Sequence, residues 1–255
     1  MEKSFFEWQD KNWATHWWYT NRIRLFKREL QQAGINLTSH VLDIGTASGN
    51  DLQMLMEAGF TNVEGIEPDI DAISFCRYKG FSRITQGSLP EMPFEDSSFD
   101  LVVATDILEH VDNDALGVRE IARVLKPGGR VLITVPAFQS MWGLQDTISL
   151  HKRRYRREEL LELCKRNGID IDTSDCFYFN YILFLPIFIA RKILNLMNGL
   201  KKNTVKNEGH INNPLLNALF DRIFYLDILT ARSLKVPFGV SLFALGRKAY
   251  QQDLH

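Results

Sequence analysis

The sequence contains few cysteines, and their spacing predicts neither a disulfide framework nor a zinc site. Only three of its 255 residues are cysteine, namely Cys76, Cys164 and Cys176, and none of them belongs to a Cys-x-x-Cys pair. An odd number of widely separated cysteines is typical of a protein from a reducing compartment. We therefore expect free thiols, a cytoplasmic location and no bound metal.

The sequence also lacks an excess of charge of either sign and a long apolar segment. It has 30 Lys and Arg against 31 Asp and Glu, which gives no general attraction to nucleic acid, and we predict no such partner. The longest uncharged run, residues 176–190, is shorter than the roughly 20 apolar residues that cross a bilayer. We predict no transmembrane helix and, from the polar first residues, no secretory signal. Peripheral membrane contact through this run stays open.

From residue 35 onward, short apolar runs alternate with amphipathic stretches. This alternation is typical of βαβ units around a parallel sheet. Predicted strands cover residues 41–44, 63–66, 84–85, 99–104, 130–135, 169–177 and 240–245. Predicted helices cover residues 50–58, 69–79, 112–125 and 157–167, and a further helix begins after Asn213. The connection 178–236 is long for an ordinary loop, so we predict an inserted cap there.

The first predicted strand runs directly into Gly45-Thr46-Ala47-Ser48-Gly49 and then into a predicted helix. A glycine-containing turn at a helix N-terminus exposes backbone N–H groups, which favour an anion such as a carboxylate or a phosphate. The spacing Gly-x-x-x-Gly differs from the dinucleotide fingerprint Gly-x-Gly-x-x-Gly. A nicotinamide-dependent oxidoreductase is therefore a weaker alternative, and an ordinary strand-to-helix turn is another.

Glu67 and Pro68 follow the second predicted strand. In an open α/β sheet, ligands bind beyond the carboxyl ends of adjacent strands. A carboxylate at that place can accept hydrogen bonds from both hydroxyls of a ribose. An isolated glutamate would more often be a solvated loop residue, but the glycine-containing turn before it favours a binding role.

An ordered set of segments gives the sequence a specific family resemblance. The segments are Val41-Leu42-Asp43-Ile44-Gly45, Glu67, Leu89-Pro90-Glu91-Met92-Pro93-Phe94, Ser98-Phe99-Asp100-Leu101-Val102, Leu108-Glu109-His110-Val111 and Arg123-Val124-Leu125-Lys126-Pro127-Gly128-Gly129. Together they resemble a class I S-adenosylmethionine-dependent methyltransferase over residues 40 to 136. The surrounding segments 16–19, 151–155 and 236–242, with Arg22, Trp142 and Asp146, resemble a type 11/12-like bacterial subgroup associated with envelope glycan and lipid pathways.

The resemblance implies an α/β/α sandwich with a Rossmann-like, doubly wound, seven-stranded sheet whose last strand is antiparallel. We divide the chain into an N-terminal helical lid at 1–34, a core at 35–177 and 237–250, and a helical cap at 178–236. Four of the five tryptophans fall within the first 18 residues. They are predicted to cover the active site, although core packing explains them equally well.

The resemblance also assigns S-adenosylmethionine as the cofactor and gives residues their roles. The implied cofactor-binding residues are Asp43, Gly45, Thr46, Gly49, Glu67, Pro68, Ser88, Leu89, Thr105 and Asp106. Two positions depart from the family pattern: Ala47 replaces the usual middle glycine of the loop, and Ser88 stands where many relatives have an aspartate. These departures motivate an alternative function, a non-catalytic module that binds the cofactor and acts as a regulator or partner.

For the acceptor side, we predict His151 and His110 as catalytic candidates, because a hydroxyl acceptor needs a general base. The alternative for His110 is a structural role. The predicted substrate-binding residues are Trp17, Tyr19, Trp142, Arg153, Arg154 and Tyr155. The basic run that contains Arg153 and Arg154 either grips a phosphate or carboxylate or begins a solvated helix. The predicted function is methyl transfer to a small or lipid-linked acceptor, glycans included, with oxygen favoured over nitrogen and carbon.

Overall fold

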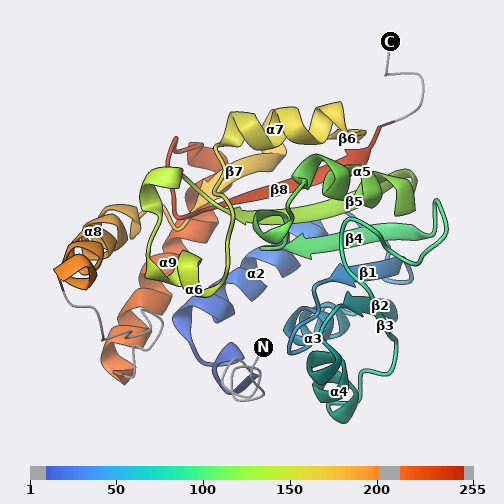
Figure 1. Ribbon diagram of the computed structural model, residues 1–255, viewed down its shortest axis with the longest axis horizontal. Helices are drawn as coiled ribbons and strands as arrows, with labels where there is room; N and C mark the ends of the chain where they lie inside the picture. Colours follow the sequence, from blue (N-terminus) through green and yellow to red (C-terminus); the bar gives the residue numbers. More distant parts are fainter. Residues whose placement is uncertain (1–9, 201–212, 250–255) are drawn as a thin grey trace.

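The computed structural model describes residues 10–200 and 213–249, and it contains one central sheet flanked by helices on both faces (Figure 1). The strands are β1 (His40–Ile44), β2 (Asn62–Glu67), β3 (Ile84–Gln86), β4 (Phe99–Thr105), β5 (Leu125–Pro136), β6 (Ile169–Asp170), β7 (Cys176–Phe179) and β8 (Ser241–Lys248). Their order is β3-β2-β1-β4-β5-β8-β6, with β7 also paired to β8. Strands β1 to β5 pair in parallel, whereas β8 runs antiparallel to its neighbours. The predicted doubly wound sheet with a reversed last strand is confirmed.

The predicted count of seven strands needs a correction, because the sheet has eight. The single strand expected at residues 169–177 is interrupted by the 3₁₀ turn η3 (Thr173–Asp175). The Asp172 carboxylate starts this turn by accepting hydrogen bonds from the backbone N–H (2.7 Å) and the hydroxyl (2.8 Å) of Ser174. Since β6 and β7 both pair with β8, they share one edge of the sheet.

The helices are α2 (Trp17–Gln32), α3 (Asn50–Glu57), α4 (Ile70–Tyr78), α5 (Asp114–Val124), α6 (Leu144–Ile148), α7 (Arg157–Arg166), α8 (Phe184–Leu200) and α9 (Pro214–Leu234), with short 3₁₀ turns η1 (Leu108–His110) and η2 (Gln139–Met141). Two of the helices, α4 and α9, begin at a side chain that caps their first turn. Asp69 accepts hydrogen bonds from two N–H groups in the first turn of α4, and Asn213 does the same for α9. Each cap satisfies donors that a helix start leaves unpaired.

Two apolar clusters hold the layers together. Helices α5 and α7 pack on one face of the sheet, and α2, α3 and α9 pack on the other. On the second face, Phe224 of α9 is fully buried and lies 5.7 Å, ring to ring, from Trp17 of α2. Helices α2 and α9, drawn in blue and orange-red in Figure 1, therefore cover the sheet itself. The division into lid, core and cap stays a prediction, but these two helices share the core of the sheet.

Helix α8 presents apolar side chains to solvent. Leu185, Ile189 and Ile193 are 60%, 49% and 53% exposed. Within the described residues, no helix is long and apolar enough to cross a membrane. Residues 201–212 of the predicted cap lie outside the described residues.

Candidate active site

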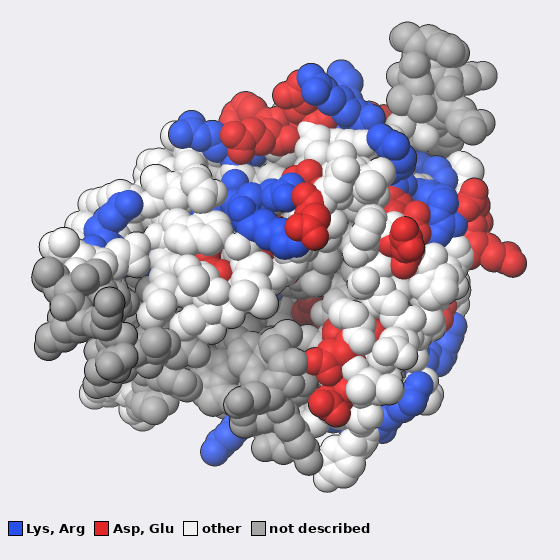
Figure 2. All heavy atoms as spheres, in the orientation of Figure 1, with Lys and Arg blue, Asp and Glu red and all other residues white. Residues whose placement is uncertain are grey.

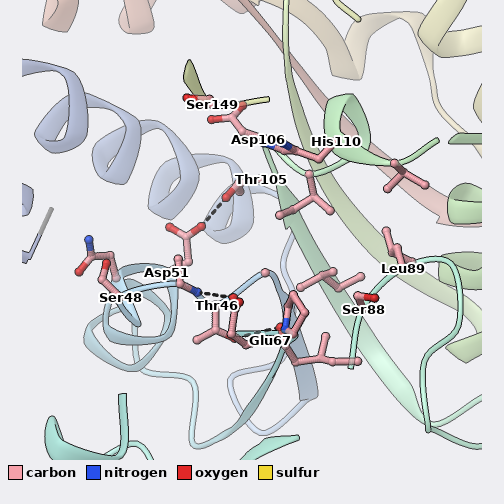
Figure 3. A pocket seen from close by; sticks show the side chains of 18 of the residues that line it. Thr46, Ser48, Asp51, Glu67, Ser88, Leu89, Thr105, Asp106, His110 and Ser149 are labelled. Atoms are coloured by element: carbon pink, nitrogen blue, oxygen red, sulfur yellow. Dashed lines mark hydrogen bonds between the residues drawn. The ribbon is translucent and has the colours of Figure 1, made fainter. Parts of the chain in front are cut away.

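A cavity of about 950 Å³ opens at the carboxyl ends of the parallel strands, beneath α2 and α6 (Figure 3). The predicted site residues that line it are Tyr19, Gly45, Thr46, Glu67, Pro68, Ser88, Leu89, Thr105, Asp106, His110 and His151. Figure 2 shows acidic side chains along the border of a hollow in this face. Four neighbouring parallel strands, β1 to β4, and the loops that follow them thus bring together residues that are distant in sequence, as expected of an open α/β sheet.

The loop after β1 has the backbone of a ligand cradle. Gly45, Ala47 and Gly49 adopt φ angles of +75°, +46° and +78°. A Cβ on Gly45 would lie only 2.1 Å from the Cδ1 atom of Ile107, so no larger residue fits without displacing that side chain. Alanine at position 47 tolerates the left-handed region at a cost of roughly 1–2 kcal/mol. The Ala47 departure from the family pattern is therefore compatible with a left-handed backbone at this position.

Glu67 closes this loop from the end of β2. Its side chain is buried, and its two carboxylate oxygens accept the backbone N–H groups of Ala47 (2.9 Å) and Asp69 (3.0 Å). Burial raises the pKa of Glu67, while the two N–H donors act in the opposite direction. A carboxylate oxygen has two lone pairs, so each one can accept a further hydrogen bond. The side chain can thus hold the loop and bind the hydroxyls of a ribose at the same time.

Two of the predicted cofactor residues lie behind the cavity wall. Asp43 is 1% exposed, and its Oδ2 atom has no hydrogen-bond partner. Burial, together with the nearby charges of Asp51 and Glu67, raises its pKa well above the usual range. Gly49 forms the N-cap of α3, where an added Cβ would meet the ring of Phe81 at 2.9 Å. Both residues shape the loop from behind.

A polar network joins α2 to the end of β4. Arg22 forms an ion pair with Asp106 and donates to the hydroxyl of Thr134 (3.2 Å), which in turn donates to Asp106 (3.1 Å). Thr105 donates its hydroxyl to Asp51 of α3. Burial raises the pKa of Asp51. The network fixes α2 above the cavity and surrounds one part of it with carboxylates.

The two predicted histidines lie at the end of the cavity that Asp106 also borders, and Figure 3 shows Asp106 beside His110. The two histidine rings meet edge to face, with centroids 4.8 Å apart. The Nδ1 atom of His151 lies 2.8 Å from Asp146 Oδ1, and Arg154 donates to both oxygens of that carboxylate at 2.9 Å. Although burial acts in the other direction, these two partners hold the pKa of Asp146 well below its usual range. Burial and the neighbouring His151 lower the pKa of His110, so its ring is neutral at pH 7.

Glu109 lies directly beside the histidine pair and is fully buried. Neither of its carboxylate oxygens has a hydrogen-bond partner, and Oε1 is 4.0 Å from His151 Nε2. Burial, with a smaller contribution from the charge of Asp106, raises its pKa well above the usual range. A buried carboxyl group without a donor is costly and therefore uncommon outside functional sites.

Two tryptophans predicted to bind substrate lie outside the cavity lining. Trp17 is 8% exposed and packs against Phe220 and Phe224 of α9. Trp142 lies between η2 and α6, where its ring N–H donates to Thr147 (3.4 Å). The contacts of both side chains are those of packing residues, because each ring faces its own protein neighbours.

The basic segment before α7 is also placed beside the cavity lining. Arg153 pairs with Asp114 at 2.7 Å, and the hydroxyl of Tyr155 donates to the same carboxylate at 2.9 Å. Arg154 is 7% exposed and donates hydrogen bonds to Asp146 and to the backbone oxygen of Ala137 (2.9 Å). These charges are satisfied within the protein, so the segment braces the histidine end of the cavity.

Four further residues shape the site, and the sequence pattern alone does not identify them as site residues. Asp51 follows the glycine loop by two residues, and Glu109 precedes His110, so both could have been found from the neighbouring motifs. Asp146 precedes His151 by five residues, in a short helical segment whose sequence shows no regular periodicity. Arg22 lines the cavity from α2 and contacts Asp106, which is 84 positions away in the sequence. No local pattern reveals such a contact.

Comparisons with known proteins agree with this geometry. Residues 42–133 match the family model for a methyltransferase domain. A probable S-adenosylmethionine-dependent methyltransferase of Mycolicibacterium smegmatis is 31% identical over 138 residues, which cover 52% of this chain and 53% of that protein. Demethylmenaquinone methyltransferase of Staphylococcus aureus is 32% identical over 130 residues, covering 46% and 54%. The chain thus aligns with about half the length of these two curated relatives.

Solved structures show the same fold over most of the chain. An S-adenosylmethionine-dependent methyltransferase from Mesorhizobium loti superposes with a TM-score of 0.52 at 16% identity, covering 86% of this chain and 96% of that one. Methyltransferases of this family take their methyl group from S-adenosylmethionine. Residues 42–133 thus match a methyltransferase domain, and the sequence similarity and the fold together support a class I S-adenosylmethionine-dependent methyltransferase.

Proposed function

We propose that this chain transfers a methyl group from S-adenosylmethionine to an oxygen atom of a small or lipid-linked acceptor, glycans included. One observation carries the proposal: a single cavity has the Glu67 loop at one part and the histidine pair at another. A donor held by the loop and an acceptor held by the histidines would therefore share one enclosed space. Positioning of this kind supplies much of the rate of a two-substrate reaction.

The residues of the first part suit the donor. S-adenosylmethionine supplies a methyl group bound to a positively charged sulfur, and the nearby carboxylates of Asp51 and Asp106 complement that charge. Glu67 has free lone pairs for the ribose, and Gly45 lines the cavity where the loop backbone would meet the methionine part. Ser88 and Leu89 line the wall where the resemblance places the adenine.

The residues of the second part suit an oxygen acceptor. A hydroxyl is a poor nucleophile until its proton leaves, whereas an amine needs less assistance. His110 is neutral at pH 7, and Asp146 holds Nδ1 of His151 so that its Nε2 atom stays available toward Glu109 and the cavity. The histidine pair is therefore where we expect the acceptor oxygen to bind and to lose its proton.

Two observations support a lipid-linked acceptor in a cytoplasmic, membrane-peripheral setting. Leu185, Ile189 and Ile193 form an exposed apolar row on α8, and such rows favour contact with a membrane surface. The three cysteines are buried free thiols, which fits a reducing compartment. Flotation with liposomes should decrease when the three α8 residues are replaced by serine. Unchanged flotation would count against membrane contact.

The acceptor can be identified with methyl-labelled cofactor. Hydroxylated glycans, quinols and lipid phosphates form the first screen, and demethylmenaquinone, after which the Staphylococcus aureus relatives are named, belongs in it. We expect a labelled O-methyl product by mass spectrometry, with turnover reduced in His151→Gln and retained in the remote control His40→Gln. An N-methyl or C-methyl product would overturn the preference for oxygen. Failure of every acceptor, with cofactor binding intact, would favour the non-catalytic module.

A further inference from the structure

We propose that Glu109, His110 and His151 bind a divalent transition-metal ion at the acceptor part of the cavity. One potential ligand atom from each of these three residues lies within 4.8 Å of the other two. Glu109 and His110 are neighbours in η1, and His151 comes from the loop after α6. The cysteine pattern of the sequence gave no reason to expect a metal, but a site of two imidazoles and one carboxylate needs no thiolate.

The carboxyl group of Glu109 is buried and lacks a hydrogen-bond partner. Its side chain is 0% exposed, both of its oxygens lack a hydrogen-bond donor, and Oε1 faces His151 Nε2 at 4.0 Å. A cation between these atoms would compensate the buried carboxylate. Ligands around a tetrahedral zinc ion lie about 3.3 Å apart, given bonds of about 2.0–2.1 Å. Glu109 can close that gap without breaking an existing hydrogen bond, because it makes none.

His151 is oriented in the way that metal-bound histidines usually are. Its Nδ1 atom is engaged by Asp146, so Nε2 is the nitrogen left to coordinate an ion. Arg154 in turn fixes Asp146 through two hydrogen bonds. A carboxylate behind a ligating histidine holds the ring orientation and strengthens the ligand.

The donor set selects the kind of ion. Two imidazoles and a carboxylate suit Zn²⁺, Fe²⁺, Co²⁺ or Mn²⁺, whereas Mg²⁺ and Ca²⁺ prefer oxygen ligands throughout. Three protein ligands leave at least one coordination position open. Since His110 and His151 both line the cavity, that position would face the acceptor.

The role of the ion rests on the proposed function, although its binding does not. A hydroxyl bound to a divalent cation loses its proton more readily, and we expect that proton to pass to solvent. The oxygen lone pair would then form the new bond to the methyl carbon while the sulfur–carbon bond breaks. The sulfur keeps that electron pair and becomes a neutral thioether. No oxidant or reductant is required.

The test uses untagged protein that has been treated with a chelator, because a histidine tag would bind metals itself. Titration with Co²⁺ should give ligand-field absorption in the visible region that saturates at one ion per chain, and Zn²⁺ should displace the Co²⁺. Glu109→Gln and, separately, His110→Asn should weaken the affinity at least about tenfold. Mg²⁺ should not displace the bound Co²⁺.

The matched control is Glu64→Gln, which removes a carboxylate beside another histidine, His40, at the far end of the sheet. This variant should bind Co²⁺ like the wild type. The proposal is overturned if the wild type shows no stoichiometric binding, or if Glu109→Gln, His110→Asn and Glu64→Gln behave alike. If the chain transfers a methyl group to oxygen but binds no metal, the metal site is refuted and the proposed function stands. If it binds the metal but transfers no methyl group, the metal site stands and the proposed function is refuted.

Discussion

Replacing Glu67 by glutamine tests whether this side chain both holds the glycine loop and binds the cofactor. Glutamine keeps the size of the side chain but offers one acceptor oxygen, so one of the two backbone N–H groups, from Ala47 or Asp69, loses its partner. A hydrogen bond to a charged group contributes roughly 1.5–3 kcal/mol. We therefore expect the free energy of unfolding to fall by about 2 kcal/mol, or the melting temperature by about 4–8 °C for a domain of this size.

The same substitution should weaken cofactor binding separately. Loss of the carboxylate that accepts the ribose hydroxyls should reduce the affinity for S-adenosylhomocysteine by roughly 10- to 100-fold, since 1.4 kcal/mol corresponds to a factor of ten. Urea unfolding measures the first effect and calorimetry the second. Glu64→Gln, three residues earlier on β2, is the control and should leave binding unchanged.

Either half of this reasoning can fail by itself. A stable Glu67→Gln variant with wild-type unfolding would show that the two backbone hydrogen bonds contribute little. A destabilised variant with unchanged affinity would show that Glu67 holds the loop and does not contact the cofactor.

Three further outcomes follow from the geometry. Burial raises the pKa of Asp227 to about 6, so the folded state holds this proton more tightly than the unfolded state does. The free energy of unfolding should therefore fall by up to about 3 kcal/mol as the pH rises from about 4 to 7. Urea titrations of Asp227→Asn should not show that fall. Gly45→Ala should lose both stability and affinity for S-adenosylhomocysteine in calorimetry, whereas Gly34→Ala, with similar positive φ but no atom within 4 Å of its Cβ, should lose only about 1–2 kcal/mol of stability. Arg22→Met should lower the free energy of unfolding by about 2 kcal/mol by breaking a largely buried ion pair, while Arg24→Met, which breaks an exposed pair, should cost less than about 1 kcal/mol; equal losses would refute the argument from burial.

The sequence predicts the fold well where structure depends on local chemistry. Asp69 and Asn213 cap helices because each side-chain oxygen reaches N–H groups only two or three residues away. The strand predicted at residues 169–177 is wrong as a single element, because Asp172 forms a competing local turn with Ser174. The Asp172–Ser174 turn can be recognised in the sequence, but the apolar residues on both sides of it favour one continuous strand.

The candidate site is only partly predictable for a different reason. Gly45 and Glu67 carry their signal in the spacing after successive strands, and the structure brings both of them to one cavity. The contact of Arg22 with Asp106 depends on how α2 packs, and it has no trace in either segment. Arg154 illustrates the same limit: its charge suggested a phosphate grip, whereas folding buries it against Asp146.

A crystal structure of the chain with S-adenosylhomocysteine tests the central claim most directly. The account predicts the ribose hydroxyls on Glu67, the adenine beside Ser88 and Leu89, and the sulfur atom facing the space in front of His110 and His151. A ligand bound elsewhere, or one whose sulfur faces away from the histidine pair, would contradict the account.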